Sequence, residues 1–235
     1  MKAFILAAGK GERMRPLTDN TPKPLLRVGG TTLLDRQIEK LAAAGIRDII
    51  VNAAYLSEKI SAHVGRYKNS DLNITVSVEP APLETGGAIF HASDLIGDAP
   101  FLLVNGDVWM DYDYMEIVGQ ASGLQRGGGC LVLVPNPVHK KEGDFCFAEE
   151  SQHGLLQLPQ SNAGPAPKST FTFSGVSVLS PSLVTDYPQC RVKFPLVEAF
   201  RWAIGQKKLS GSVFNGYWLD VGTPERLQEL KTRLP

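Results

Sequence analysis

The chain has 235 residues, of which 43% are hydrophobic and 20% charged, a composition typical of a globular protein with one sizeable core. Its 24 Lys and Arg residues balance its 24 Asp and Glu residues, and the lack of a basic excess argues against a general nucleic-acid-binding protein. The spacing of the three cysteines indicates neither a disulfide framework nor a zinc site, and no apolar window approaches the roughly 20 residues of a membrane span. We therefore expect a cytoplasmic protein that binds neither nucleic acid nor membrane.

Short apolar runs alternate with helical patterns in the first half of the chain. Residues 31–44 predict a helix with Thr32 as its N-cap and Asp35 completing a weak capping box. The alternation of strands and helices favours right-handed βαβ crossovers and a mostly parallel sheet. The other elements expected here are strands at 3–7, 49–52, 74–78 and 101–104 and helices at 56–67 and 86–95.

The second half has a different texture, in which strands separate longer irregular stretches. Strands are expected at 130–134, 174–179 and 216–221, and the Pro, Ser and Gly residues of 158–168 indicate a surface loop. A final helix is expected to begin after Thr223, because a threonine cap followed by proline is a typical helix start.

The segment that follows the first strand, LAAGKGERMRP from Leu6 to Pro16, is rich in glycine. Glycines let backbone N–H groups approach phosphate oxygens closely and form an anion-binding nest. The segment is not a dinucleotide-binding fingerprint, because Met14 stands where the third glycine is needed, and it is not a P-loop, because Lys10 is followed by Gly11. Ten residues after Arg13, the stretch Thr21-Pro22-Lys23-Pro24-Leu25 holds one lysine between two prolines, which keep its backbone extended.

Two aspartates come at or just beyond the ends of apolar runs. Asp107 follows 101–104 after Asn105 and Gly106, and Asp220 lies in the last predicted strand. Open α/β sheets bind ligands at the carboxyl ends of their strands, and two carboxylates together with nucleotide phosphates are suitable ligands for Mg²⁺. Each aspartate by itself is better explained as a turn or cap residue.

The combined pattern L-A-A-G-x-G-x-R-M-x-P…T-P-K-P-L resembles the signature of the sugar-nucleotide pyrophosphorylases, a family of nucleotidyltransferases, and the resemblance covers almost the whole chain. It implies an α/β fold with a Rossmann-like, mostly parallel mixed sheet flanked by helices, in a single domain over 1–235. Residues 1–110 would form the nucleotide-binding half and 111–235 the sugar-binding half. The resemblance further implies that Arg13 and Lys23 are catalytic cations that handle phosphate. Asp107 and Asp220 would hold Mg²⁺.

The resemblance also predicts how the nucleotide is bound. Glu79 stands where the family often has a glutamine that faces the base. A carboxylate can accept a hydrogen bond from N3–H of uracil or thymine, or from N1–H and the amino group of guanine, whereas cytosine and adenine lack a ring N–H on that edge. With Arg13, Lys23 and Glu79, the expected nucleotide-binding residues are Leu6, Ala8, Gly9, Lys10, Gly11, Glu12, Thr85 and Gly86.

Several segments, among them 82–87, 102–109 and 171–176, are most similar to the branch of the family that uridylylates N-acetylmuramate 1-phosphate in peptidoglycan recycling. UTP and that sugar 1-phosphate are therefore the expected substrates. The chain departs from the family at 156–159, where the common Glu-Lys-Pro is absent and a lysine near the sugar phosphate is missing. The candidates to replace that lysine are Lys168, Arg191 and Lys193. The expected sugar-binding residues are Asn105, Gly143, Asp144 and Ser174.

Two alternatives stay open at this point. One is a guanylyl- or thymidylyltransferase for another hexose 1-phosphate, such as mannose 1-phosphate. The other is a catalytically inactive relative that senses sugar nucleotides or serves as an assembly subunit. Such a relative is expected to have lost at least one of Arg13, Lys23, Asp107 and Asp220, and all four are present. A monomer or a weak homodimer is the expected assembly state.

Overall fold

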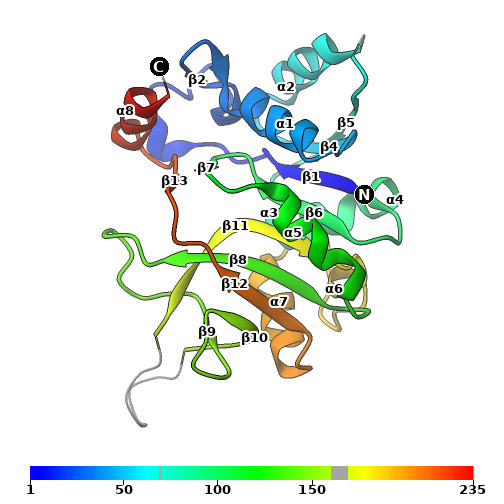
Figure 1. Ribbon diagram of the computed structural model, residues 1–235. Helices are drawn as coiled ribbons and strands as arrows, with labels where there is room; N and C mark the ends of the chain where they lie inside the picture. The colour runs from blue at the N-terminus through cyan, green and yellow to red at the C-terminus, as the bar shows by residue number, and fades with distance from the viewer. Residues whose placement is uncertain (69, 160–168, 235) are drawn as a thin grey trace.

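The computed structural model describes residues 1–68, 70–159 and 169–234 (Figure 1). Within these ranges the chain forms a nine-stranded sheet in the order β5-β4-β1-β6-β11-β8-β12-β10-β9. Strands from the first half of the chain form one side of this sheet: β1 (Lys2–Leu6), β4 (Asp48–Ala53), β5 (Asn73–Val78) and β6 (Phe101–Asn105). Strands from the second half form the other side: β8 (Gly129–Pro135), β9 (Cys146–Phe147), β10 (His153–Gln157), β11 (Phe171–Leu179) and β12 (Leu209–Val213).

The sheet is mixed, and its parallel part lies where the sequence predicts βαβ units. Strands β5, β4, β1 and β6 pair in parallel, and so do β12 and β8. Strand β11 runs antiparallel to both of its neighbours, β6 and β8. The parallel neighbours β1, β4 and β5 share their carboxyl ends at one edge, so the loops that follow them meet there.

Helices cover both faces of the sheet. On one face, Phe4 of β1 and Leu103 of β6 pack in a core with α3, α6 and α7. On the other face, Ile5 and Val104 pack with α1, α2 and α5. Successive strand residues point to opposite faces, so a continuous apolar run such as 101–104 supplies both cores. The described helices are α1 (Leu33–Ala43), α2 (Ser57–Val64), α3 (Glu84–His91), α4 (Ser93–Ile96), α5 (Tyr114–Val118), α6 (Ser182–Thr185), α7 (Leu196–Gly205) and α8 (Pro224–Arg233).

The predicted capping box of α1 is confirmed, and it extends into a larger network. Thr32 accepts from the Asp35 amide, while the Asp35 carboxylate accepts from the Thr32 amide. Asp35 Oδ1 also lies 2.6 Å from His63 Nε2 and accepts a hydrogen bond from the Tyr67 hydroxyl at 2.7 Å. Burial by itself raises the pKa of Asp35, but the hydrogen bonds from His63, Tyr67 and Thr32 outweigh it and hold that pKa well below its usual range. The ionised carboxylate thereby ties α1 to α2 and the turn after it.

Several element boundaries differ from those predicted. The helix expected at 86–95 begins earlier, at Glu84, and breaks into α3 and α4. The last predicted strand is shorter, and it pairs outside the main sheet: β13 (Trp218–Asp220) runs antiparallel to β7 (Val108–Met110). The expected loop 158–168 lies mostly outside the described residues. Among the residues described, no helix is both long and apolar enough to cross a membrane.

Candidate active site

A cavity of about 520 Å³ opens at the carboxyl ends of the parallel strands. Each of these strands contributes one lining residue at or just beyond its end: Leu6 for β1, Asn52 for β4, Glu79 for β5 and Asn105 for β6. This edge is where open α/β sheets bind ligands. The remaining lining residues come from the glycine-rich loop, from Lys23 and Pro24, from 82–85, and from Asp107 and Gly222.

The glycine-rich loop forms one wall of the cavity and presents unpaired backbone donors. Gly11 adopts a left-handed conformation with φ of 65°, and the Thr18 hydroxyl donates to its carbonyl at 2.8 Å. A Cβ at Gly11 would come within 2.9 Å of Thr18 Cγ2, so a side chain is excluded there. The backbone amides of residues 8–11 donate to no acceptor among the residues that the structure describes. Free amides on a tight loop are typical of an anion-binding nest.

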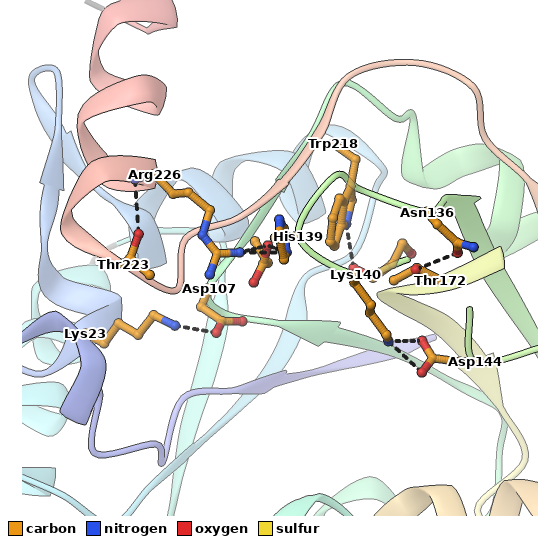
Figure 2. A network of polar contacts seen from close by, with 12 residues as sticks. Lys23, Asp107, Asn136, His139, Lys140, Asp144, Thr172, Trp218, Thr223 and Arg226 are labelled. Carbon is orange, nitrogen blue, oxygen red and sulfur yellow. Dashed lines mark hydrogen bonds and ion pairs between the residues drawn. The ribbon is translucent and has the colours of Figure 1, made fainter. Parts of the chain in front are cut away.

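Lys23 and Asp107 both line the cavity, and their side chains point toward each other (Figure 2). Lys23 Nζ donates to Asp107 Oδ2 at 2.5 Å, and the lysine side chain is only 10% exposed. A buried ammonium held this tightly is a fixed positive charge rather than a solvated surface lysine. The aspartate side chain is 37% exposed and remains accessible from the cavity.

Asp220 lies close to Asp107 because β13 pairs with β7. The register places Asp220 opposite Val108, and the Val221 amide donates to the Asp107 carbonyl at 2.7 Å. The Asp220 carboxylate forms an ion pair with Arg226 and lies 3.3 Å from His139 Nε2. Figure 2 shows Arg226 and His139 side by side.

The site offers few protein ligands for a metal. No group of three or more His, Cys, Asp and Glu side chains in the described part of the chain is placed to hold a metal ion. Mg²⁺ commonly binds through one or two carboxylates together with substrate phosphates and water. Asp107 and Asp220 fit an ion that arrives with the phosphates of a substrate. Lys23 and Arg226 neutralise the two carboxylates in the structure.

Glu79 is buried and hydrogen-bonded to other residues of the protein, which the sequence does not indicate. It is 4% exposed, its Oε1 accepts from Asn52 Nδ2 at 2.6 Å, and its Oε2 accepts from the Leu83 amide at 3.0 Å. Asn52 Oδ1 in turn accepts from the Ala7 amide at 2.6 Å. Each carboxylate oxygen has a second lone pair, so Glu79 can shape the cavity and still accept from a ligand. Asn52 went unnoticed in the sequence because it is a single polar residue in an apolar strand.

Of the other two residues expected near the base, only Thr85 lines the cavity. Its hydroxyl oxygen accepts a hydrogen bond from the Leu196 amide at 2.9 Å, which joins α3 to the start of α7. Gly86 does not line the cavity. Its amide donates to the Phe194 carbonyl at 2.9 Å, and a Cβ there would lie 2.4 Å from the Phe194 ring. This close approach is by itself a structural reason for a glycine at 86.

The expected sugar-binding residues fall in different environments. Asn105 lines the cavity, and its side chain packs against Gly175, where φ is 88° and a Cβ would come 2.7 Å from Asn105 Nδ2. Ser174 is fully buried, and its hydroxyl oxygen accepts from the Val176 amide at 3.2 Å. The hydroxyl of Ser174 is therefore directed into the protein in the structure. The Ser174 carbonyl accepts from the Trp218 indole at 2.9 Å.

Gly143 and Asp144 do not line the cavity. Figure 2 shows Asp144 paired with Lys140. The Gly143 amide, expected to be free for a sugar hydroxyl, donates to Thr170 Oγ1 at 3.2 Å. Both oxygens of Asp144 lie 2.6 Å from Lys140 Nζ, and one of them also accepts from the Phe173 amide. Asp144 keeps lone pairs for a ligand, whereas the Gly143 amide is occupied.

Two of the three candidates for the missing lysine, Arg191 and Lys193, do not line the cavity. Both Arg191 Nη groups are 2.8 Å from the Glu198 carboxylate, and the guanidinium lies over the Phe194 ring. Lys193 is exposed and does not line the cavity, and Lys168 lies outside the described residues. The basic side chains next to the proposed metal ligands are Lys23 at Asp107 and Arg226 at Asp220, and the His139 ring lies beside Arg226. No local sequence pattern points to Arg226 or His139, because their proximity to Asp220 depends on the tertiary fold.

Comparison with known proteins places these features in a family. The family model described as nucleotidyl transferase matches residues 2–235. N-acetylmuramate alpha-1-phosphate uridylyltransferase of Neisseria meningitidis is 42% identical over 97% of this chain and 96% of that protein. The protein of the same name from Caulobacter vibrioides is 30% identical over 99% of this chain and 96% of that protein. Mannose-1-phosphate guanyltransferase of Candida albicans is 32% identical over 96% of this chain, which spans 62% of that protein.

Solved structures support the same fold. A Bacillus anthracis protein provisionally assigned as a glucose-1-phosphate thymidylyltransferase superposes with a TM-score of 0.85 at 20% identity, covering 100% of this chain and 95% of that one. HddC from Yersinia pseudotuberculosis, complexed with GMP-PN, superposes with a TM-score of 0.76 at 24% identity, covering 100% of this chain and 99% of that one. At these identities the likeness concerns the fold alone. The match over residues 2–235, together with a relative 42% identical across nearly the whole chain, shows that this protein belongs to the nucleotidyl transferase family.

Proposed function

We propose that this protein transfers the uridylyl group of UTP to N-acetylmuramate 1-phosphate, with release of pyrophosphate, in peptidoglycan recycling. The observation that carries the proposal is the convergence of unpaired loop amides, Lys23 and Asp107 on one cavity at the strand ends, with Asp220 held close to Asp107 by the pairing of β13 with β7. Two relatives, 42% and 30% identical over nearly their whole lengths, bear the name of this activity. All four charged residues that the chemistry needs are present in the chain, which argues against an inactive sensor.

In the proposed reaction, an oxygen of the sugar phosphate attacks the α-phosphorus of UTP. A new phosphorus–oxygen bond forms, the bond from the α-phosphorus to the bridging oxygen breaks, and the electron pair leaves with pyrophosphate. Because two polyanions must meet, the protein lowers the barrier mainly by positioning them and by neutralising charge. The loop amides and Arg13 are suited to the triphosphate. Lys23 is suited to the charge that develops as pyrophosphate leaves.

Asp107 and Asp220 are the residues proposed to hold Mg²⁺. The bound ion would neutralise phosphate charge between donor and acceptor. In the structure these carboxylates are paired with Lys23 and Arg226. Both carboxylates must exchange at least part of these contacts when a cation binds, which leaves the two basic side chains available to phosphate. Residues 1–110 are proposed as the nucleotide-binding half and 111–235 as the sugar-binding half.

Glu79 is proposed to select the base by accepting the N3–H of uracil. The same carboxylate can accept from N1–H and the amino group of guanine, and a mannose-1-phosphate guanyltransferase is 32% identical. A guanylyltransferase for mannose 1-phosphate is therefore the second candidate. Against it stands the lower identity: the chain is 32% identical to that guanyltransferase and 42% identical to the uridylyltransferase of Neisseria meningitidis.

Release of pyrophosphate, measured for single pairs of nucleoside triphosphate and sugar 1-phosphate, tests the proposal. UTP with N-acetylmuramate 1-phosphate should give the highest kcat/KM. A highest value for GTP with mannose 1-phosphate would select the second candidate. Absence of pyrophosphate release with every pair, in the presence of Mg²⁺, would contradict a catalytic role altogether.

A further inference from the structure

Asp107 and Asp220 lie at the same end of a small two-stranded sheet that is separate from the main sheet. Asp107 immediately precedes β7, and Asp220 is the last residue of the antiparallel strand β13. Each strand has three residues, and a two-stranded sheet of this size is not stable by itself in water. The position of the two carboxylates at the cavity therefore depends on what holds β7 and β13 in place.

The two edges of β7 have different neighbours. In an antiparallel pair, successive residues direct their backbone N–H and C=O groups alternately toward and away from the partner strand. The Asp107 carbonyl and the Asp111 amide bond to the residues that flank β13, at 2.7 and 3.0 Å. The carbonyls of Val108 and Met110 therefore face the other edge, which has no neighbouring strand among the described residues. Both residues are buried, so these carbonyls need partners inside the protein.

Side chains of α1 supply those partners. Gln37 Nε2 donates to the Val108 carbonyl, and Lys40 Nζ donates to the Met110 carbonyl at 2.5 Å. Gln37 and Lys40 are three residues apart on the helix, so they lie on the same face of α1. The helix thus takes the place of a third strand beside β7.

Gln37 is a buried polar residue with a partner at each end of its amide. It is 2% exposed, and its Oε1 accepts from the buried Tyr114 hydroxyl at 2.7 Å. The helix that carries it is itself fixed, because Leu34, Ile38 and Leu41 are fully buried in the core. Gln37 therefore connects a rigid helix to the first residue of β7.

We propose that Gln37 is a positioning residue for the metal site. Through its hydrogen bond to Val108 it fixes where Asp107 and Asp220 stand relative to the cavity. Asp107 precedes Val108 in the chain, and the register places Asp220 opposite Val108, so this one contact is adjacent to both carboxylate-bearing residues. The inference rests on the metal role proposed above for the two aspartates. Groups that orient metal ligands from behind are needed for full metal affinity.

Three substitutions separate positioning from stability. Q37M keeps the length of the side chain and removes its hydrogen bonds. Y114F is the matched control, because it removes only the hydroxyl that donates to Gln37 Oε1 and leaves the bond to Val108 in place. Both variants leave a buried polar group without its partner, so both should lower Tm. K40M removes the second contact at the same edge of β7. Lys40 is only half-buried, so K40M provides the test if Q37M does not fold.

The measurement is calorimetric titration of each folded protein with UTP in the absence of a sugar 1-phosphate, once with excess Mg²⁺ and once with EDTA. The ratio of the two Kd values is the gain in UTP affinity that Mg²⁺ provides. Q37M should lower this gain by roughly tenfold, or abolish a smaller gain, as is typical when a group that orients a metal ligand is lost. K40M should change it in the same direction, and Y114F should keep the gain of the wild-type protein.

A contact with a purely structural role would lower Tm and leave the gain unchanged. An unchanged gain in Q37M, or in K40M if Q37M does not fold, would therefore overturn the inference, and so would an equal loss in Y114F. Absence of any gain in the wild-type protein would overturn the metal role of the two aspartates and this inference with it. Binding of GTP in place of UTP would contradict the proposed nucleotide, and the same comparison made with GTP would then decide the role of Gln37.

Discussion

Replacement of Glu79 should have two effects that can be measured separately: a lower free energy of unfolding and a changed preference among nucleotide bases. The carboxylate accepts from the Asn52 side chain and from the Leu83 amide, both of them buried. E79L leaves these two donors without acceptors, and each buried unsatisfied group costs about 1–3 kcal/mol. The free energy of unfolding should therefore fall by roughly 2–6 kcal/mol. For a protein of this size each kcal/mol lowers Tm by about 2–4 °C.

The conservative variant E79Q should retain one acceptor and lose less stability, since only one of the two donors then faces the new amide group. It should also keep much of the preference for uridine, because the amide oxygen can still accept from N3–H. E79L should lose that preference. The assay is the kcat/KM for UTP relative to GTP and CTP, measured below the Tm of each variant.

N52A is the matched control, because it removes the same side-chain hydrogen bond and leaves the carboxylate in place. It should lower Tm without changing the ranking of the nucleotides. An unchanged ranking in E79L would refute base selection by Glu79. A changed ranking in N52A alone would transfer that role to Asn52, which also lines the cavity.

Three further predictions concern the charged residues. D107N and D220N should each lower turnover by roughly 10²-fold or more with an unchanged circular dichroism spectrum, and near-normal turnover in both would remove the metal assignment. K23A should lower kcat more than it raises the KM for UTP, since Lys23 is expected to act in the transition state; a change in KM alone would make it a binding residue. The depressed pKa of Asp35 means that its contribution to stability is complete above the unfolded-state pKa of about 4 and is lost as pH falls below it. Urea unfolding between pH 5 and pH 3 should show a smaller loss of stability in D35N than in the wild-type protein, and equal losses would contradict the network.

Local sequence signals predicted the elements that depend on local interactions. The cap of α1 was predictable because Thr32 and Asp35 bond within one helical turn, and the start of α8 because Thr223 and Pro224 act on the next residues. Strand β12 was missed. Its sequence, LSGSV, is small and polar, and it becomes a strand only through pairing with β8 and β10.

The residues of the candidate site that belong to a sequence motif could be predicted. Those that reach the site only through the tertiary fold could not. The glycine-rich loop, Lys23 and Asp107 lie together at the cavity as expected. Arg226 is 119 residues from Asp107 in sequence, and it reaches the site because β13 pairs with β7. Gly86 and Gly143 do not line the cavity, and their close contacts could not be predicted because a glycine required by such a contact and a glycine required by a ligand look alike in a sequence.

The central claim is that this protein joins uridylate to N-acetylmuramate 1-phosphate. A single competition reaction tests it most directly: UTP and GTP at equal concentrations, with the 1-phosphates of N-acetylmuramate, N-acetylglucosamine and mannose at equal concentrations, Mg²⁺, and an inorganic pyrophosphatase to draw the reaction forward. Mass spectrometry of the early products identifies the base and the sugar of each sugar nucleotide in one measurement. The account predicts UDP-N-acetylmuramate as the main product. A main product of UDP-N-acetylglucosamine, or of GDP-mannose, would contradict it.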